Sequence, residues 1–415
     1  MNARKIFSWN SMYNTIIAIK DKYEQLTKQS IINVPFVEVL KTINDNFLLK
    51  GATYTQLNNN QYSLLLIKYS LLGGIDDIYT NPQSIFREGR SLVIDLQSEE
   101  IVLCPFRKFF NLNEIEETSL QNVLKYINDG ANLEVSNKLD GSMQAVRYWK
   151  GQFIYSGSSA LDENNSPQLK SGKKLFFSNS KLQQLVKDFP DYTVIFEALL
   201  EDDPHIVHYV GSSLNLIGMR NVYTGQTLSY DELQNIANLY DIPATSIETH
   251  SIFDLLKMRS KFTASDKEGW VIRLTFNKEN DLRIKLKCDD YVKIHSLCNG
   301  LNSPNAIVKE IVNNTFDDSI SKVPIGLKSQ IIAIKNKINK FVQMKMQLIE
   351  QCYNQVKNIK DNKQFALYVQ KNIDKIFQPY MYMIRKNKKI NLLEKRTNQY
   401  TSYTEINEFL DRYFR

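Results

Sequence analysis

The sequence predicts an α+β protein whose central region forms antiparallel sheets and whose C-terminal domain is all helical. Two observations support this class. Between residues 90 and 293 the chain consists of short runs rich in β-branched and aromatic residues, often alternating in polarity as strands do. On either side of that span, apolar residues recur at helical spacing instead. Strands and helices that are segregated along a chain are typical of the α+β class.

The first 85 residues are expected to form a mostly helical segment packed on the core. Their early apolar residues approximate one helical stripe: Trp9, Met12, Tyr13, Ile16, Ile17, Tyr23 and Leu26. The asparagine run at 58–60 and the pair Gly73-Gly74 interrupt the pattern.

Residues 86–297 are expected to hold the sheets. The strand candidates are short and β-rich: SLVIDL, EIVLCPF, MQAVRYW, QFIYSGS, YTVIFEALL, SLNLIGMRNV, GWVIRLTF and LRIKLKC. Helices are predicted between them near 118–129, 179–188 and 230–241.

Residues 298–415 are expected to form a helical, basic domain. Apolar stripes run from 327 to 352 and from 365 to 377, the second ending near Pro379, and Ser402 with Glu405 can form a capping box. Residues 301–415 hold 20 of the 52 Lys and Arg and 10 of the 45 Asp and Glu, a balance of +10, so the rest of the chain balances to 32 − 35 = −3. A nucleic-acid partner explains this surplus; a solvated helical face is the alternative, which composition alone favours.

Composition excludes several classes of protein. Hydrophobic residues make up 43% and charged residues 23%, which indicates a globular chain, not a disordered or fibrous one. Because no apolar run is long enough for a bilayer, no membrane partner is expected. The four cysteines are scattered without a CxxC pair, which argues against a disulfide framework or a zinc site and favours a cytoplasmic, reducing compartment.

Lys138 is the first candidate for chemistry. It stands in Asn-Lys-Leu-Asp-Gly-Ser between two strand candidates, so we expect it at a turn where Gly141 lets a backbone approach a phosphate. A lysine amine becomes a nucleophile toward phosphorus once it loses its proton, which nearby positive charge or desolvation favours. Taken alone, the tetrapeptide is more often a surface Asp-Gly turn.

Acidic and basic groups on later strands strengthen that candidate. Glu197 ends an apolar strand and Glu268 opens another. On the strand after that, alternation places three basic residues on one face, Arg283, Lys285 and Lys287. Such a row suits a triphosphate and would favour the neutral form of a neighbouring lysine. Each feature alone is more often structural.

Together and in this order, Lys-x-Asp-Gly, Phe-Glu, Glu-Gly-x-Val and Lys-x-Lys resemble the covalent nucleotidyltransferase superfamily of ligases and capping enzymes. Further segments resemble one branch, the phage-type RNA ligase 1 family: Glu88–Ile94, Pro105–Glu114, His205–Tyr209, Leu216–Val222 and Asp289–Val292. Of these, His205–Tyr209 and Leu216–Val222 resemble the middle strands of that family. The resemblance covers about residues 88–318.

The resemblance implies a nucleotidyltransferase (ATP-grasp-like ligase) core and an ATP-dependent RNA ligase that uses ATP and Mg²⁺. Lys138 would attack the α-phosphate of ATP to form lysyl-AMP. The AMP would pass to an RNA 5′-phosphate, and an RNA 3′-hydroxyl would then displace it. The implied partner is RNA with such ends, cleaved tRNA among the possibilities, contacted by the basic C-terminal domain of a monomer.

The resemblance also assigns roles to residues. Nucleotide or phosphate contacts are expected from Arg90, Lys108, Asp140, Gly141, Glu268, Lys285 and Lys287. Glu197 and Asp317, the latter beside Asp318, are the expected magnesium ligands, since this ion prefers carboxylate and water oxygens. Asp140 is expected to orient Lys138.

The sequence departs from the family at two places. The family carries a lysine in the strand after the nucleophile turn, but 155–160 has none; Lys170, Lys173 and Lys174 are the possible substitutes. Cys104 stands where the family has arginine. The four histidines are not spaced as a metal cluster and are expected to be satisfied or surface residues.

Two other functions stay open. A DNA ligase or capping enzyme would share the motifs but normally adds an OB barrel after Lys-x-Lys, where this chain is predicted to be helical. A non-catalytic RNA-binding or scaffold protein would require the motifs to be relics.

Overall fold

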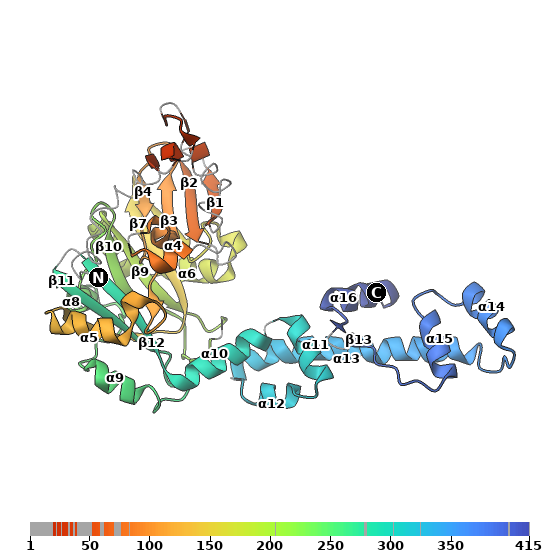
Figure 1. The fold of residues 1–415 in the computed structure, drawn as a ribbon. Coiled ribbons are helices and arrows are strands. Elements are labelled where there is room, and N and C mark those ends of the chain that lie inside the picture. The colour runs from red at the N-terminus through yellow and green to blue at the C-terminus, as the bar shows by residue number, and fades with distance from the viewer. Residues whose placement is uncertain are drawn as a thin grey trace. The chain divides into compact units, whose positions relative to one another are not determined.

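The computed structural model describes residues 20–21, 23–25, 27–31, 34–35, 38–39, 52–58, 62–69, 76–82, 84–203, 205–277, 280–301, 303–323, 325–396 and 399–414. The chain divides into two compact units, Met1–Val292 and Lys293–Arg415. The division falls inside one helix, α10 (Asp289–Leu301) (Figure 1).

Within the described residues, the first unit contains three four-stranded sheets. The first sheet has the order β1 (Ala52–Asn58), β2 (Ser63–Tyr69), β3 (Arg90–Asp95), β4 (Ile101–Leu103). The second has the order β10 (Ser213–Asn221), β9 (Tyr192–Leu199), β7 (Ser142–Trp149), β8 (Gln152–Gly157). The third has the order β5 (Phe110–Asn111), β12 (Asn280–Lys287), β11 (Gly269–Asn277), β6 (Asn132–Lys138). The short β5 runs parallel to β12, whereas the other pairs in these sheets are antiparallel.

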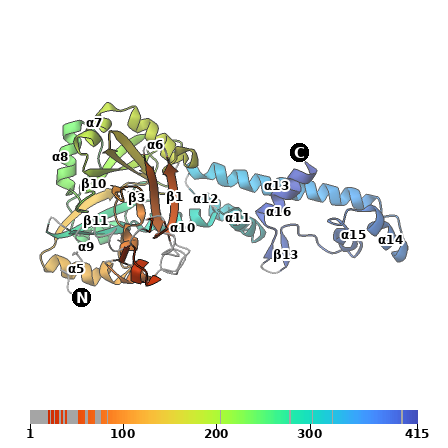
Figure 2. The same ribbon diagram turned by 90° about the horizontal axis from the view of Figure 1, so that it is seen from above.

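Helices cover the second sheet. The helices of this unit include α4 (Asp76–Thr80), α5 (Leu120–Asn128), α6 (Pro167–Phe177), α7 (Ser180–Asp188), α8 (Tyr230–Tyr240) and α9 (Ile252–Met258). Figure 2 shows α6, α7 and α8 along one side of β10. Their apolar stripes, which include Phe176, Leu185 and Leu233, pack on buried strand residues such as Val146 and Phe196.

The eight strand candidates quoted from the sequence between 90 and 293 are present, and so are the three helices predicted there. Two helices were not predicted, α6 and α9. The mostly helical prediction for the N-terminal segment is wrong over 52–69, where β1 and β2 form a hairpin. The run Leu64 to Ile67 is buried throughout, and a run that is apolar on both faces carries no period that separates strand from helix. Most of the remaining N-terminal prediction lies outside the described residues.

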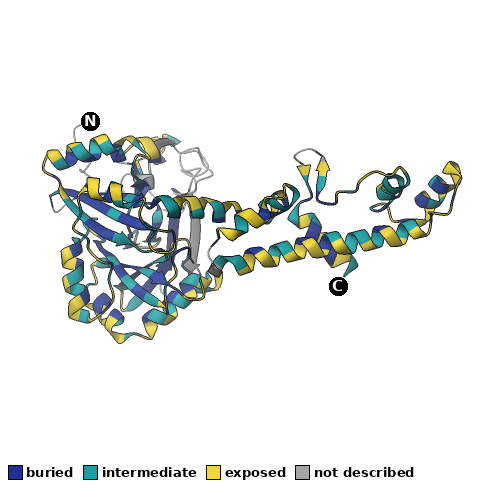
Figure 3. Ribbon diagram, turned by 90° about the horizontal axis from the view of Figure 1, so that it is seen from below, coloured by how far each residue is buried: buried dark blue, intermediate teal, exposed yellow. Residues whose placement is uncertain are grey.

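The second unit is built from helices around a long central one. They are α10, α11 (Pro304–Val312), α12 (Phe316–Ser321), α13 (Ile325–Asn354), α14 (Asn362–Asn372), α15 (Gln378–Arg385) and α16 (Tyr403–Tyr413). Buried and exposed residues alternate along α13 as an amphipathic helix requires (Figure 3). The predicted capping box of Ser402 and Glu405 begins α16.

The prediction of an all-helical C-terminal domain is wrong at one place. β13 (Glu394–Arg396) and β14 (Gln399–Tyr400) form a small antiparallel ribbon before α16. The ribbon is too short to give an alternating pattern in the sequence. Among the described helices of the whole chain, none combines the length and the apolar character that crossing a bilayer requires.

Candidate functional site

The register of the third sheet brings the two lysine motifs together. Gly269 on β11 pairs with Lys287 of β12 on one side and with Lys138 of β6 on the other. Both lysines therefore end their strands at the same edge, although 149 residues separate them in the chain. Lys138 is the last residue of β6 and lies at the predicted turn.

Glu268 joins these two lysines. One of its carboxylate oxygens accepts from Lys138 Nζ at 2.7 Å and the other pairs with Lys287 Nζ at 3.0 Å. The carboxylate is almost fully buried, and burial strengthens charge-assisted hydrogen bonds of this kind. Glu268 thus fixes the position of the nucleophile candidate and of one phosphate-contact candidate at once.

Glycine at 269 makes this edge possible. Its φ of +149° lies in a region that side-chain-bearing residues avoid, and a Cβ there would stand 2.1 Å from the carbonyl oxygen of Leu286. Any other residue would push β11 away from β12. The Glu-Gly pair of the sequence motif is therefore one structural unit. Its glycine allows β11 to approach β12 closely, and its acid bridges the two lysines.

Lys138, Lys285 and Lys287 line one cavity, and the amine of Lys285 is poorly solvated there. Its Nζ stands 4.7 Å from the centre of the Phe109 ring. Burial, together with the charges of Arg90 and Lys108, lowers the pKa of Lys285 to about 6. Without a bound anion this amine is therefore largely neutral at pH 7, and an anionic ligand would draw a proton onto it.

Arg90 and Lys108 flank the same aromatic pair. The guanidinium of Arg90 lies 4.9 Å from the Phe109 ring centre, so Arg90 and Lys285 share one ring. Lys108 Nζ lies 4.8 Å from the Phe110 ring centre, and burial lowers the pKa of Lys108. Arg90 lines the cavity; Lys108 acts on it through its charge on Lys285.

Glu197 forms the opposite wall. One of its carboxylate oxygens accepts a hydrogen bond from the backbone N–H of Gly141 at 3.1 Å. A Cβ on Gly141 would lie 2.5 Å from the Ala198 carbonyl oxygen, so glycine is needed for the turn to reach β9. Burial raises the pKa of Glu197 to about 7, which makes this acid sensitive to pH near neutrality.

Asp140 is held by the loop between β9 and β10. Its carboxylate accepts from the backbone N–H of Val207 at 3.0 Å and from the Tyr291 hydroxyl at 2.9 Å. His205 adds an ion pair of 3.4 Å to Asp140 and a contact of 3.2 Å to Asp203. Since protein groups surround this carboxylate, Asp140 is placed to orient the turn that carries Lys138.

His205 is thus engaged by protein groups, as predicted, and its partner Asp140 belongs to the turn that carries Lys138. Burial alone would lower the pKa of His205, yet the hydrogen bonds that its ring donates to Asp140 and Asp203 outweigh burial and raise that pKa to about 10. The prediction that 205–209 forms a strand is wrong, because this segment is the loop after β9. The loop conformation lets a backbone N–H, an imidazole and the Tyr209 hydroxyl all meet the turn.

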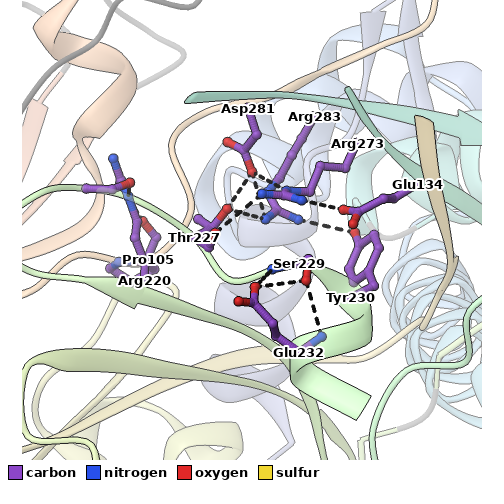
Figure 4. A network of polar contacts seen from close by, with 11 residues as sticks. Pro105, Glu134, Arg220, Thr227, Ser229, Tyr230, Glu232, Arg273, Asp281 and Arg283 are labelled. Carbon is purple, nitrogen blue, oxygen red and sulfur yellow. Dashed lines mark hydrogen bonds and ion pairs between the residues drawn. The ribbon is translucent and has the colours of Figure 1, made fainter. Parts of the chain in front are cut away.

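Arg283, the first member of the basic row, is neutralised by the protein. Its guanidinium pairs with Asp281 at 2.9 Å and donates to Thr227 and to the Tyr230 hydroxyl, as Figure 4 shows. The side chain also stacks 4.1 Å from the Phe106 ring centre. Arg283 therefore supports the cavity wall, and Lys285 and Lys287 remain the members placed to meet an anion.

The cavity formed by these groups has a volume of about 300 Å³. It is also lined by apolar side chains that the sequence did not single out as site residues: Pro105, Phe106, Ile217 and Val271. Phe106 lies against Gly218, where a Cβ would stand 2.1 Å from the ring. Phe106 and Ile217 lie in segments on which the family resemblance rests, so the resemblance could have identified them as site residues.

The remaining candidates are placed as follows. Asp317 lies on α12 in the second unit, where it is exposed and pairs with Lys335 at 2.9 Å, and its role as a metal ligand stays a prediction. None of Lys170, Lys173 and Lys174 is among the described residues that line the cavity; Ser158, from the segment that lacks the family lysine, does line it. Cys104 is buried beside Thr193.

The acids of the first unit allow a test of whether Mg²⁺ fits. Both oxygens of Glu268 are engaged by lysines, whereas one oxygen of Glu197 bonds only to a backbone N–H. No group of three or more His, Cys, Asp or Glu with metal-binding geometry occurs among the described residues. Mg²⁺ commonly takes one or two carboxylates and completes its shell with water and phosphate oxygens. Glu197 fits that donor set.

Comparison with known proteins agrees with this site. The model of a family described as RNA ligase matches residues 88–292, which contain every residue of the cavity described above. The matched span is just under half of the chain, and the match agrees with the resemblance to the phage-type RNA ligase 1 family.

Relatives are distant. A candidate RNA ligase of Thermovibrio ammonificans is 23% identical over 62% of this chain and 66% of its own length. A candidate bifunctional polynucleotide kinase/RNA ligase of Autographa californica nuclear polyhedrosis virus is 22% identical over 70% of this chain and 41% of its own. The chain thus spans just under two thirds of the first relative and about two fifths of the second. Among solved structures, an archaeal ATP-dependent RNA ligase is 13% identical and aligns over 76% of this chain and 81% of its own with a TM-score of 0.45.

Proposed function

We propose that the protein is an ATP-dependent RNA ligase that joins an RNA 5′-phosphate to an RNA 3′-hydroxyl through a lysyl-AMP intermediate. The observation that carries the proposal is the edge of the third sheet. There Lys138 and Lys287, both bridged by Glu268 within hydrogen-bond distance, line a cavity whose wall also contains apolar side chains. A nucleotide needs both environments, one for its base and one for its phosphates.

In the first step, Lys138 Nζ attacks the α-phosphorus of ATP. A nitrogen–phosphorus bond forms while the bond from the α-phosphorus to the bridging oxygen breaks, and pyrophosphate leaves. Lys138 must lose a proton to react, and Glu268, already within 2.7 Å of Nζ, is the acceptor that the geometry offers.

Lys287, and Lys285 once the bound phosphates have drawn a proton onto it, would stabilise the phosphate charge during this step. Preorganised cations in a poorly solvated site are effective because they need no reorganisation when charge develops. Arg90 is placed to do the same from β3. The apolar walls at Phe106, Ile217 and Val271 would hold the base.

In the second step the AMP moves to the 5′-phosphate of RNA, and in the third the 3′-hydroxyl attacks that activated phosphate and releases AMP. Mg²⁺, when bound, would offset phosphate charge, and Glu197 is the residue that would hold it, directly or through water. Asp140, held by Val207, His205 and Tyr291, would keep the turn in place throughout.

The second unit would contact RNA. Its surplus of basic residues supports salt-sensitive affinity for a nucleic acid. The region directly after β12 is helical in the described residues, which argues against the OB barrel of a DNA ligase or capping enzyme at this place. Cleaved tRNA is the substrate that the family resemblance points to. Action as a cytoplasmic monomer stays a prediction.

The test is covalent labelling. Purified protein is first stripped with pyrophosphate and then incubated with Mg²⁺ and ATP labelled at the α-phosphate, beside Lys138→Ala and the matched control Lys257→Ala, an exposed lysine on α9. We expect label that is acid-labile and alkali-stable on the wild type and the control, and none on Lys138→Ala. No label on the wild type with either ATP or GTP would overturn the proposal. Supplying RNA or DNA strands to the labelled protein then tests the substrate.

A further inference from the structure

In the second unit, α13 turns a lysine toward the protein interior. Lys345 follows the buried Phe341 by one turn on the same helix face. Its Nζ is surrounded by three aromatic rings, at 5.2 Å from the ring centre of Phe341, 5.4 Å from Tyr380 and 5.3 Å from Phe409. Among the residues that the structure describes, no carboxylate lies within ion-pair distance of this ammonium.

This placement does not serve stability. Removing an ammonium from water without a counterion is costly, and aromatic faces return only part of that cost. Burial accordingly lowers the pKa of Lys345, and the charge of Glu405 offsets only part of that effect. A methionine or leucine would pack at the same place without this penalty. The lysine therefore has a use that packing does not explain.

Lys345 lines a cavity of about 550 Å³, the size of a site for a small molecule. The rings of Tyr380, Phe409 and Tyr413 form part of its wall, and Lys395 and Arg412 also line it. Such a cavity offers a cation without a direct ion pair beside several aromatic rings, and these are the two kinds of group that hold a nucleotide through its phosphate and its base.

The acids of this cavity are largely engaged elsewhere. Glu405 accepts the capping hydrogen bonds of Ser402 and pairs with Lys395. Glu394 accepts from the Asn391 side chain at 3.2 Å. Glu408 is exposed to solvent. Among the described residues none of these carboxylates forms a direct ion pair with Lys345, so its ammonium can still meet an anion.

We propose that this cavity binds one nucleotide of a single-stranded RNA segment, with a phosphate on Lys345 and the base against the aromatic wall. The surplus of ten basic residues in 301–415 provides the charge complementarity. The proposal rests on the proposed function only in that RNA is taken as the ligand. It adds a second RNA-binding site that lies wholly in the second unit.

The experiment measures RNA binding, covalent labelling and stability on the full chain. Binding of a short fluorescent single-stranded RNA is followed by anisotropy for the wild type, Lys345→Met, Lys345→Arg and Lys340→Met. Lys340 is an exposed lysine on the same helix, so its variant loses the same charge outside the cavity. Labelling of Lys138 by ATP and thermal unfolding are recorded for each variant.

We expect Lys345→Met to weaken RNA binding about tenfold, the loss typical of one charge-assisted contact, while it labels normally and unfolds at an equal or higher temperature. Lys345→Arg should recover most of the affinity, and Lys340→Met should weaken binding less than about twofold. RNA binding of Lys345→Met equal to that of the wild type would overturn the proposal, and so would equal losses in Lys345→Met and Lys340→Met. If the wild type fails to label Lys138 but Lys345→Met still loses RNA affinity, the ligase proposal fails and this one stands.

Discussion

The two units of the molecule use their positive charge in opposite ways. In the first unit, Lys138 and Lys287 are mostly buried and share one buried acid, with side-chain exposures of 19%, 22% and 3% for Lys138, Lys287 and Glu268. In the second unit, a typical pair such as Lys335 with Asp317 lies at the surface, where 88% of the aspartate side chain is exposed. Buried charges interact strongly with few partners, whereas exposed charges are screened by water and salt.

The difference in solvation suits the two sets of charges to different roles. The buried charges suit catalysis, and the exposed charges suit long-range attraction of a polyanion. Poor solvation gives Lys285 and Glu197 pKa values near neutrality, which suits groups that exchange protons or meet phosphates. Exposed pairs contribute little individually, but many lysines together create a field that draws in a polyanion. Lys345 is the exception, since its ammonium is poorly solvated although it belongs to the unit whose lysines are mostly exposed.

The largest effect is expected from substituting the poorly solvated Lys285. Lys285→Met should slow labelling of Lys138 about 10²- to 10³-fold, the usual loss for one preorganised phosphate contact. It should also stabilise the protein. The folded-state pKa of Lys285 lies below its unfolded value, so its cost to stability is absent above pH 10 or so, grows as the pH falls and is complete below about pH 6.

Labelling rates and thermal unfolding at pH 6, 8 and 10 check this prediction, with Lys257→Met as the exposed control. The gain in stability of Lys285→Met over the wild type should be larger at pH 6 than at pH 10. A gain that does not change with pH would show that Lys285 is solvated like the lysines of the second unit.

A second comparison uses one glycine from each unit. Gly269→Ala forces a Cβ against the Leu286 carbonyl at an unfavourable φ, and it should destabilise the first unit by about 2–4 kcal/mol and reduce labelling. Gly300→Ala lies in a helix with no atom within 4 Å of the new Cβ, and it should stabilise that helix by about 0.5 kcal/mol. Chemical unfolding of both variants measures this. Similar effects of the two substitutions would contradict the register of β11 and β12.

The smallest effect is expected at His205. Its folded-state pKa of about 10 exceeds its unfolded value of 6.5, so its stabilising contacts with Asp140 and Asp203 are fully present below about pH 6.5 and are lost as the pH rises to 10. His205→Gln should therefore lower the free energy of unfolding by about 1–2 kcal/mol at pH 6 and by progressively less toward pH 10. Labelling should also slow, because the turn loses a support.

Denaturant unfolding between pH 6 and pH 10 measures the difference. His250→Gln, which alters a histidine that contacts Glu248 and not Asp140, is the control for labelling. An equal stability loss at both pH values would mean that His205 only fills space.

Much of this architecture could be predicted from local patterns. The alternation in 282–288 predicted which face of β12 carries the lysines, and the turn at Lys138 followed from strand signals on both sides of an Asp-Gly pair. Residues 64–67 were wrongly assigned to a helical segment, because four consecutive buried apolar residues show no period that separates strand from helix. The small ribbon at 394–400 was missed because two very short strands give no alternation.

From the residues alone one could infer the class of fold, the order of the motifs, the nucleophile candidate and the basic character of the C-terminal unit. These depend on short-range periodicity, turn chemistry and charge counts, all of which are local properties. The partners of the charged groups were decided only by tertiary structure. Pairing of β6, β11 and β12 placed Glu268 between Lys138 and Lys287, a loop brought His205 to Asp140, and helix packing enclosed Lys345 in three rings. Burial and distance set the strength of those interactions, and neither exists until segments far apart in the chain have packed together.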